Sequence, residues 1–187
     1  MPHLSPKELV SISELETILE ITLSARDNFI DEFSNGYVVR DGKIRILILH
    51  QLEIPQIPAE ISYLKHLEGL FLLENGITHL PNSLGELGKL RELYLSNNNI
   101  SVIPKSVGNL SELKVLNLSN NKIQQLPEEI SGLLNLRELY LSGNLLVELS
   151  PSIAKLPRLR ELSVVRNPQL NIPVEIKEMK LDYLGVD

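Results

Sequence analysis

The sequence predicts an α/β fold, a stack of repeats in which each repeat contributes one short strand and one short helical turn. Two observations carry this prediction. Residues of the same type recur with a fixed period of 23 positions, and such a period is typical of stacked, solenoidal architectures. Within each copy the apolar spacing changes from two residues, which is typical of a strand, to three, which is typical of a helical turn.

Six copies of the repeat follow one another without a gap. They share the pattern L-x-x-L-x-L-x-x-N-x-I-x-x-L-P-x-x-I-x-x-L-x-x and open at Ile44, Leu67, Leu90, Leu113, Leu136 and Leu159. Leu93 and Leu95 alternate as a strand requires. The Pro residue suits the start of a short helical or 3₁₀ turn, because that position needs no backbone donor. No single repeat can bury its own Leu side chains, so neighbouring repeats must stack.

One polar position recurs inside this apolar pattern. In five of the six repeats it is Asn, namely Asn75, Asn98, Asn121, Asn144 and Asn167. In a stack these side chains lie one above another, where we expect them to bond the backbone of the turn that leaves each strand. We therefore interpret them as structural, and not as a metal or substrate site.

Residues 1–43 lie outside the repeat and are predicted to form an N-terminal capping segment, a helix followed by a hairpin strand. The end repeat of a stack exposes apolar core and an unpaired strand edge, so it needs a cap. Asp41-Gly42 lies between two apolar runs, and this dipeptide is a strong signal for a two-residue hairpin turn. We therefore expect an antiparallel strand beside the first repeat strand.

The helix of this segment is expected to begin at Ser5-Pro6, because Ser caps a helix and Pro suits its first position. A second possible start at Ser13 leaves open a break near Ser11. A further short turn is expected within residues 29–33, which carry Phe and Ile side chains.

The repeats are predicted to extend over residues 44–181 and residues 182–187 to form a short closing strand, all within one structural domain. The period breaks at this end, because Leu181, Leu184 and Val186 restore the pattern one residue early. No C-terminal cap of any size is expected. Two alternatives stay open: the closing segment covers the last repeat, or a partner or second copy of the chain covers it.

The repeat pattern resembles the leucine-rich repeat family, and the resemblance covers roughly residues 44–181. The L-P-x-x-I form is similar to the intracellular 23-residue repeats of Ras-suppressor-like and plant Ras-group proteins. The resemblance implies a curved right-handed solenoid, with a parallel sheet on its concave side and short helical or 3₁₀ turns on its convex side. It also implies protein binding on the concave side and no catalytic activity.

In this fold, positions three, five, seven and eight of each repeat point to the concave, solvent-facing side. We expect the partner-binding residues there, at Ile48, Phe71, Leu73, Glu74, Glu92, Tyr94, Asn117, Glu138, Tyr140 and Glu161. Aromatic residues are candidate anchors because they bury a large area at a small entropic cost. The glutamates favour a partner whose apolar groups are flanked by Lys or Arg.

Two alternatives to this interpretation stay open. Aromatic and β-branched residues favour strands in any case, and the glutamates would keep an exposed sheet soluble. The N-terminal hairpin is also a candidate cover for Ile46 and Ile48. His50 is expected on the same face, as a solvated or interface residue and not as a catalytic base.

Composition and motifs exclude several classes of function. The chain has no Cys and a formal net charge of −6, so disulfides and Cys-based metal sites are excluded, and nucleic acid and anionic membranes are disfavoured partners. No apolar run is long enough to span a membrane, and no signal peptide is recognised. The lack of Cys fits a cytoplasmic protein. No phosphate-binding, zinc-protease or hydrolase motif occurs, so we expect no cofactor, no metal and no enzyme activity.

The sequence therefore predicts a monomeric, cytoplasmic protein–protein interaction module of the scaffold or signalling kind, which binds a protein partner through its concave face. One alternative is a regulator or effector of a small GTPase, suggested by the resemblance to Ras-group repeats. Another is a structural protein that self-associates through its C-terminal edge as a dimer.

Overall fold

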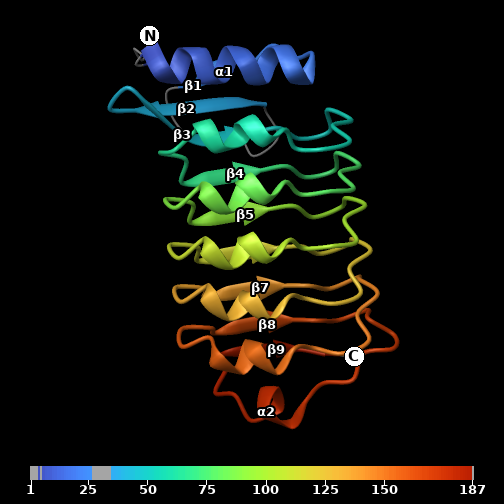
Figure 1. Cartoon of the computed structure of the whole chain (residues 1–187). Coiled ribbons are helices and arrows are strands. Elements are labelled where there is room, and N and C mark those ends of the chain that lie inside the picture. Colours follow the sequence, from blue (N-terminus) through green and yellow to red (C-terminus); the bar gives the residue numbers. More distant parts are fainter. Residues whose placement is uncertain (1–3, 5, 27–34, 187) are drawn as a thin grey trace.

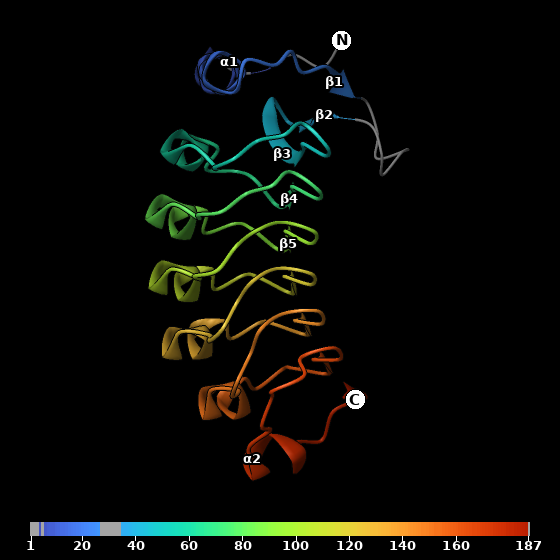
Figure 2. The same cartoon turned by 90° about the vertical axis from the view of Figure 1, so that its right-hand side faces the viewer.

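The computed structural model describes residues 4, 6–26 and 35–186. In this part of the chain one sheet contains nine strands, whose order follows the sequence from β1 to β9 (Figure 1). The strands are β1 (Ala25–Arg26), β2 (Gly36–Arg40), β3 (Lys43–Ile48), β4 (Gly69–Phe71), β5 (Glu92–Tyr94), β6 (Val115–Asn117), β7 (Glu138–Tyr140), β8 (Glu161–Ser163) and β9 (Tyr183–Gly185). The sheet forms one side of a regular stack, and short helices form the other (Figure 2).

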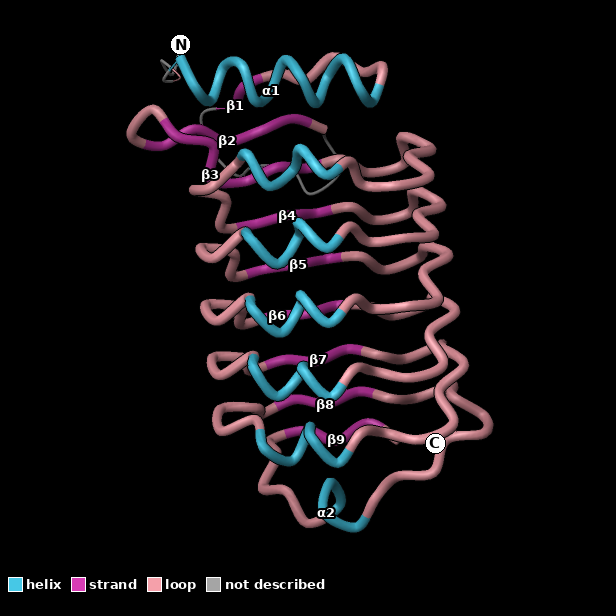
Figure 3. The backbone as a smooth tube through the Cα atoms, in the orientation of Figure 1, coloured by secondary structure: helices cyan, strands magenta, loops and turns pink. Residues whose placement is uncertain are grey.

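Helical segments alternate with the repeat strands and also lie at the two ends of the stack (Figure 3). The α-helices are α1 (Pro6–Leu19) and α2 (Val174–Lys177). The 3₁₀ helices are η1 (Ala59–Tyr63), η2 (Asn82–Glu86), η3 (Lys105–Asn109), η4 (Glu128–Gly132) and η5 (Pro151–Lys155). Each of the first four 3₁₀ helices follows a Pro with φ between −72° and −68°, close to the value that the proline ring imposes. The predicted alternation of strand and helical turn is confirmed.

Neighbouring repeat strands pair in parallel, with a register of one repeat. Leu70 lies opposite Leu93, so each residue lies beside its equivalent 23 positions further along the chain. The last strand departs by one residue, because Leu162 pairs with Leu184; this is the shift that the early return of the pattern indicates. The Leu and Ile residues that open the repeats are all buried, and they form part of one continuous apolar core.

Asn98 shows how successive repeats are joined. Its side chain is buried, its Oδ1 accepts hydrogen bonds from the backbone N–H groups of Asn75 (3.1 Å) and Ile77 (2.9 Å), and its Nδ2 donates to the carbonyls of Leu72 (2.8 Å) and Leu95 (3.0 Å). Equivalent bonds to the preceding repeat are made by Asn75, Asn121, Asn144 and Asn167. The structural interpretation of these residues is confirmed.

Two glycines allow the 3₁₀ helices to approach one another on the convex side. A Cβ atom at Gly85 would lie 2.2 Å from the carbonyl oxygen of Ser106, and one at Gly108 would lie 2.1 Å from that of Glu129. Both distances are far shorter than a van der Waals contact, and the obstructing atoms belong to the backbone. The spacing between these repeats therefore excludes a side chain at either position.

The N-terminal helix packs across the end of the stack, against η1. α1 is continuous from Pro6 to Leu19, so the alternative of a break near Ser11 is wrong. Ile12 and Leu15 are both buried in the core, and their apolar face runs through the proposed break, so a continuous helix buries more apolar surface. The expected cap at Ser5 and the turn within residues 29–33 lie outside the described residues.

The predicted hairpin is confirmed. Asp41 and Gly42 have positive φ angles of 53° and 68°, and β2 pairs antiparallel with β3, with a bulge between Val38 and Val39. The sheet continues one strand further than the sequence indicates, because β1 pairs in parallel with β2. A strand of two residues carries no periodicity that could reveal it.

The C-terminal end of the stack is formed by α2, the helical turn of the sixth repeat, and by β9. Ile176 of α2 is fully buried in the core, and α2 packs against η5. Met179 and Leu181 are partly buried against the same core. This turn keeps the Pro-x-x-Ile spacing of the repeat, from Pro173 to Ile176.

The Asn98→Ala substitution should lower the free energy of unfolding by about 3 kcal/mol, because it leaves several buried backbone N–H and carbonyl groups without a partner. Urea unfolding followed by circular dichroism measures this loss. Asn99→Ala is the matched control, since its half-exposed side chain makes no hydrogen bond to the described residues and its loss should change stability by less than about 0.5 kcal/mol. Equal effects of the two substitutions would contradict a structural role for the repeated Asn.

Candidate functional site

The predicted partner-binding residues lie on one face of the sheet, but they differ in exposure. Glu74 and Glu92 are exposed, whereas Ile48 is only 2% exposed. The remaining residues are half-buried: Phe71, Leu73, Tyr94, Asn117, Glu138, Tyr140 and Glu161. The face is therefore a sheet of partly exposed side chains, beside a hollow of about 380 Å³ that Ile46, Phe71 and Glu92 help to line.

An aromatic pair forms the most ordered feature of this face. The rings of Phe71 and Tyr94 are stacked, with centroids 4.9 Å apart and an interplanar angle of 9°. Their strands are neighbours in the sheet, and the two residues lie opposite each other in the register. A Cβ atom at Gly69 would lie 2.9 Å from Cε2 of Phe71, so the absence of a side chain there makes room for the ring. The sequence predicted both aromatics on this face, and the structure adds their direct contact.

His50 extends the pair on its N-terminal side, but it is not the solvated or interface residue that the sequence predicts. Its ring meets Phe71 edge-on, with centroids 6.5 Å apart and an interplanar angle of 87°. The residue is buried, and its Nδ1 accepts a hydrogen bond from the backbone N–H of Leu73 (3.2 Å). We therefore assign His50 a structural role, supporting the aromatic pair.

Ile48 is a correction to the predicted site. It lies between Gly36 of β2 and Phe71 of β4 in the sheet, and it is almost fully buried. A strand on each side does not by itself bury a side chain, since Phe71 and Tyr94 are flanked in the same way and stay half-buried. We remove Ile48 from the candidate interaction surface because its side chain is not accessible to a partner.

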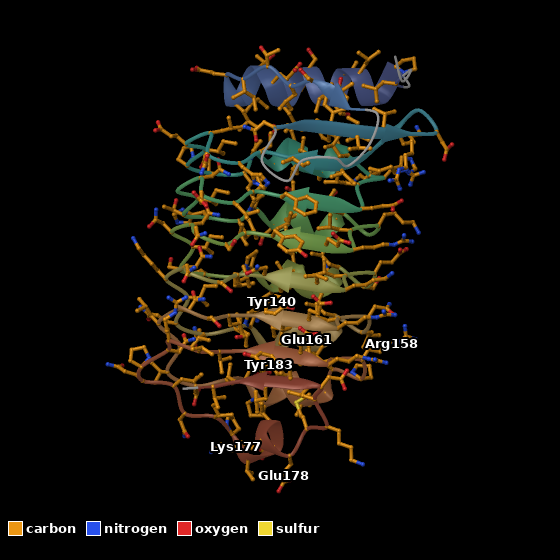
Figure 4. All side chains as sticks on the ribbon, turned by 180° about the vertical axis from the view of Figure 1, so that it is seen from behind. Tyr140, Arg158, Glu161, Lys177, Glu178 and Tyr183 are labelled. Carbon is orange, nitrogen blue, oxygen red and sulfur yellow. The ribbon has the colours of Figure 1, made fainter. Side chains whose placement is uncertain are left out.

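Tyr140 and two glutamates form a second ordered feature, which we call the tyrosine–carboxylate cluster. The Tyr140 hydroxyl lies 2.7 Å from Oε2 of Glu161 and 3.0 Å from Oε2 of Glu138, and its single proton serves both carboxylates. Figure 4 shows Tyr140 and Glu161 on the same face of the sheet. Burial, followed by these hydrogen bonds and the two negative charges, raises the pKa of the Tyr140 hydroxyl far above its usual value. The hydroxyl is thus already engaged, which leaves the ring as the part that can meet a partner.

The predicted glutamates of this face do not form one continuous row. Val115, a buried residue, occupies the equivalent position between Glu92 and Glu138. Glu74 accepts a hydrogen bond from the Gln51 side chain (2.8 Å). The structure therefore brings together Glu138 and Glu161, and it leaves Glu92 and Glu74 as separate exposed carboxylates beside the aromatic pair.

The residue at position eight of each repeat has a left-handed backbone conformation. All six residues there have positive φ, between 53° and 69°, and only one is Gly: Gln51, Glu74, Asn97, Asn120, Gly143 and Arg166. This conformation turns the chain out of each strand. Asn117, three residues before Asn120, uses its side-chain oxygen to accept the backbone N–H of Ser119 (3.0 Å). Its amide therefore has a local role that the sequence did not indicate.

Further features limit the chemistry of the described residues. Within residues 4, 6–26 and 35–186, no group of three or more His, Cys, Asp or Glu side chains is arranged as a set of metal ligands. No helix among these residues has the length and apolar character needed to cross a membrane.

Sequence reasoning overlooked position two of the repeat. The same 23-residue count places Arg or Lys there in five of the six repeats. This recurrence of basic residues is visible in the sequence, but position two lies outside the set of positions that the strand pattern assigns to the concave side.

Removing the hydroxyl in Tyr140→Phe should flatten the loss of stability at high pH. The folded-state pKa lies above the unfolded one, so this stabilisation is fully present below the unfolded pKa of about 10 and is lost as the pH rises toward the folded value. Urea unfolding between about pH 8 and pH 11 measures the slope. Tyr183→Phe, which removes an exposed tyrosine from the same sheet, is the control. The same slope in wild type and Tyr140→Phe would show that the hydroxyl is not held by the carboxylates.

Sequence comparisons identify the repeat. A family model described as leucine rich repeat matches residues 43–100 and 89–146, and a second, described as two copies of the repeat, matches residues 134–175. No significant match was found among curated protein sequences.

Several solved structures are similar to this chain. A leucine-rich repeat protein of Leptospira interrogans is 30% identical, with a TM-score of 0.63, over 75% of this chain and 42% of its own. An internalin of Listeria monocytogenes is 26% identical, with a TM-score of 0.58, over 69% of this chain and 37% of its own. The chain thus spans less than half the length of either protein.

A third similar structure contains a bound factor. The ectodomain of a plant membrane receptor kinase of Arabidopsis thaliana, solved in complex with CASPARIAN STRIP INTEGRITY FACTOR 2, is 24% identical, with a TM-score of 0.61. The match covers 86% of this chain and 23% of that one, and at this identity it shows the fold alone. The first family model by itself matches more than half of the sequence, in the segment where the structure shows the repeated strands. The chain therefore belongs to the leucine-rich repeat family.

Proposed function

We propose that this chain is a non-catalytic protein–protein interaction module that binds its partner on the sheet face, with Phe71 and Tyr94 at the centre of the interface. The observation that carries the proposal is the stacked pair itself. Two aromatic rings lie in contact, partly exposed, on a sheet whose backbone is held by bonds between repeats. Aromatic residues in rigid surroundings are the usual centres of binding energy at protein interfaces.

The aromatic pair of Phe71 and Tyr94 is held in one arrangement before a partner binds, and this favours binding. Each ring restricts the other, and the ring of His50, in the segment that follows β3, meets Phe71 edge-on. Side chains that are ordered before binding lose less conformational entropy when a partner covers them. The exposed carboxylates of Glu74 and Glu92 flank the rings, so the surface suits an apolar or aromatic group accompanied by Lys or Arg.

The comparisons support this class of function. The Arabidopsis thaliana ectodomain has the same repeat fold and was solved with a factor bound. A solenoid offers a long surface on which residues from successive repeats lie side by side, and repeat proteins use such surfaces for binding. Regulation of a small GTPase stays a prediction from the repeat resemblance.

The double substitution of Phe71→Ala with Tyr94→Ala should abolish partner binding, with a loss of about 3–4 kcal/mol, because hot-spot aromatics contribute roughly 2 kcal/mol each. Affinity capture from the native lysate with wild-type protein, followed by quantitative titration of the captured partner, measures the loss. Tyr63→Ala with Leu134→Ala is the matched control, since both residues are exposed and lie in or just after 3₁₀ helices, away from the sheet. Unchanged capture by the Phe71 and Tyr94 variant, with thermal stability preserved, would place the interface elsewhere.

Self-association is a second candidate, favoured by the C-terminal edge of the sheet. Within the described residues β9 pairs with β8 alone, Tyr183 is 50% exposed and Val186 is 46% exposed. An open strand edge with apolar neighbours is a surface that a second copy can extend. Sedimentation velocity over a wide concentration range tests it: an increase in mass that Tyr183→Lys with Val186→Lys removes would support an edge-to-edge dimer, and a constant monomer mass would exclude it.

A further inference from the structure

Position two of the repeat forms a straight row along one flank of the sheet, at the start of each strand. The backbone carbonyl of each member except the last accepts one or two hydrogen bonds from the next repeat; for example, the carbonyl of Arg137 accepts from the N–H groups of Arg160 (2.8 Å) and Glu161 (2.9 Å). The row, which we call the flank row, consists of Arg45, Glu68, Arg91, Lys114, Arg137, Arg160 and Asp182. Side chains on neighbouring members start about 4.8 Å apart.

The N-terminal part of the flank row is neutralised by carboxylates. Arg45 forms an ion pair with Glu68 (2.9 Å), and Arg91 reaches both Glu68 (3.4 Å) and Glu112 (3.5 Å). Lys89 also pairs with Glu112 (2.7 Å). Positive and negative side chains therefore alternate here, and this part of the row has little net charge to offer a ligand.

The C-terminal part of the flank row has an excess of cations. Arg137, Arg158, Arg160 and Lys180 line a surface hollow of about 500 Å³ together with a single carboxylate, Asp182. Arg160 contacts Asp182 at 3.7 Å, and both side chains are about two-thirds exposed. The Arg158 guanidinium donates to the amide oxygen of Asn135, a neutral group. Arg137 and Lys180 form no ion pair with any described residue.

A cluster of exposed cations with few carboxylate partners raises the electrostatic energy of the isolated protein. Like charges on neighbouring strands repel one another, and among the described residues the only ion pair that these four cations form is the exposed one between Arg160 and Asp182. A concave surface lined by one sign of charge concentrates the field and attracts ions of the opposite sign. Guanidinium groups in addition offer paired donors that match a carboxylate.

We propose that this hollow binds an acidic peptide segment, a short run of Asp and Glu side chains. The cations of the hollow, from Arg137 to Lys180, precede three neighbouring strands and span about 10 Å, which matches about three residues of an extended peptide. A long polyanion such as a nucleic acid fits less well, because Glu138 and Glu161 lie in the adjoining row of the sheet and would repel its continuation. The residues lining the hollow also include no aromatic side chain on which a base could stack. Figure 4 shows Arg158 at the flank of the sheet, to the side of Glu161.

The test is a fluorescence-anisotropy titration of the full chain with a labelled oligo-glutamate peptide and with an oligo-glutamine peptide of the same length. Arg137→Gln with Lys180→Gln removes two lining cations that have no ion-pair partner among the described residues. Lys122→Gln with Lys155→Gln removes the same charge at two exposed positions that do not line the hollow. We expect the first variant to bind the acidic peptide roughly tenfold more weakly, and the second to change by less than about twofold.

Urea unfolding of the same variant distinguishes ligand binding from a structural role of these cations. If Arg137 and Lys180 only stabilised the fold, their removal would lower the midpoint of urea unfolding, whereas relief of the repulsion should leave it unchanged or raise it. Equal affinity for the acidic and neutral peptides, or equal losses in the two variants, would overturn the proposal, as would tighter binding of a single-stranded oligonucleotide of the same charge. The Phe71→Ala with Tyr94→Ala variant should bind the acidic peptide as wild type does, so failure of the sheet-face proposal is distinguishable from failure of this one.

Discussion

The hydrogen bonds between equivalent positions of successive repeats are the constraint on which the rest of this structure depends. Each strand contributes only a few residues to the sheet, too few to be stable alone. The buried Asn side chains connect the turn after one strand to the turn after the next, as Asn98 does with Asn75 and Leu72. These bonds fix the register, because the amide reaches its partners only when the repeats are aligned residue for residue.

Once the register is fixed, every variable position of the repeat becomes a row on the surface. Residues 23 positions apart in the sequence become direct neighbours, so a change at one position alters the environment of two others. Phe71 stacks on Tyr94 for this reason, and Tyr140 reaches Glu161 of the next repeat for the same reason. The scaffold residues are alike from repeat to repeat, and the differences between rows carry the chemistry that a partner can recognise.

Two such rows have opposite character. The sheet face combines ordered aromatic rings with carboxylates, while the C-terminal part of the flank row presents cations around a hollow. These two surfaces lie at different levels of the stack because only some repeats carry carboxylates beside the flank row. Glu68 and Glu112 neutralise the flank row near the aromatic pair. Among the described residues, no equivalent pair of carboxylates forms ion pairs with Arg137. A partner that carries both an apolar group and an acidic segment would be held at two places on one rigid surface.

The repeat length, the placement of the repeat strands and 3₁₀ turns, the role of the Asn residues and the hairpin at Asp41 could all be predicted from the amino-acid sequence. Each of these follows from local periodicity or from the conformational preference of one or two residues. Which predicted surface residues are accessible, and what they touch, could be learned from the folded structure alone. Ile48 is almost fully buried, whereas Phe71 and Tyr94 at the equivalent position are half-buried. The Tyr140 hydroxyl is engaged because one carboxylate from its own strand and one from the next strand converge on it. Both outcomes depend on where side chains end in space, and periodicity along the chain carries no such information.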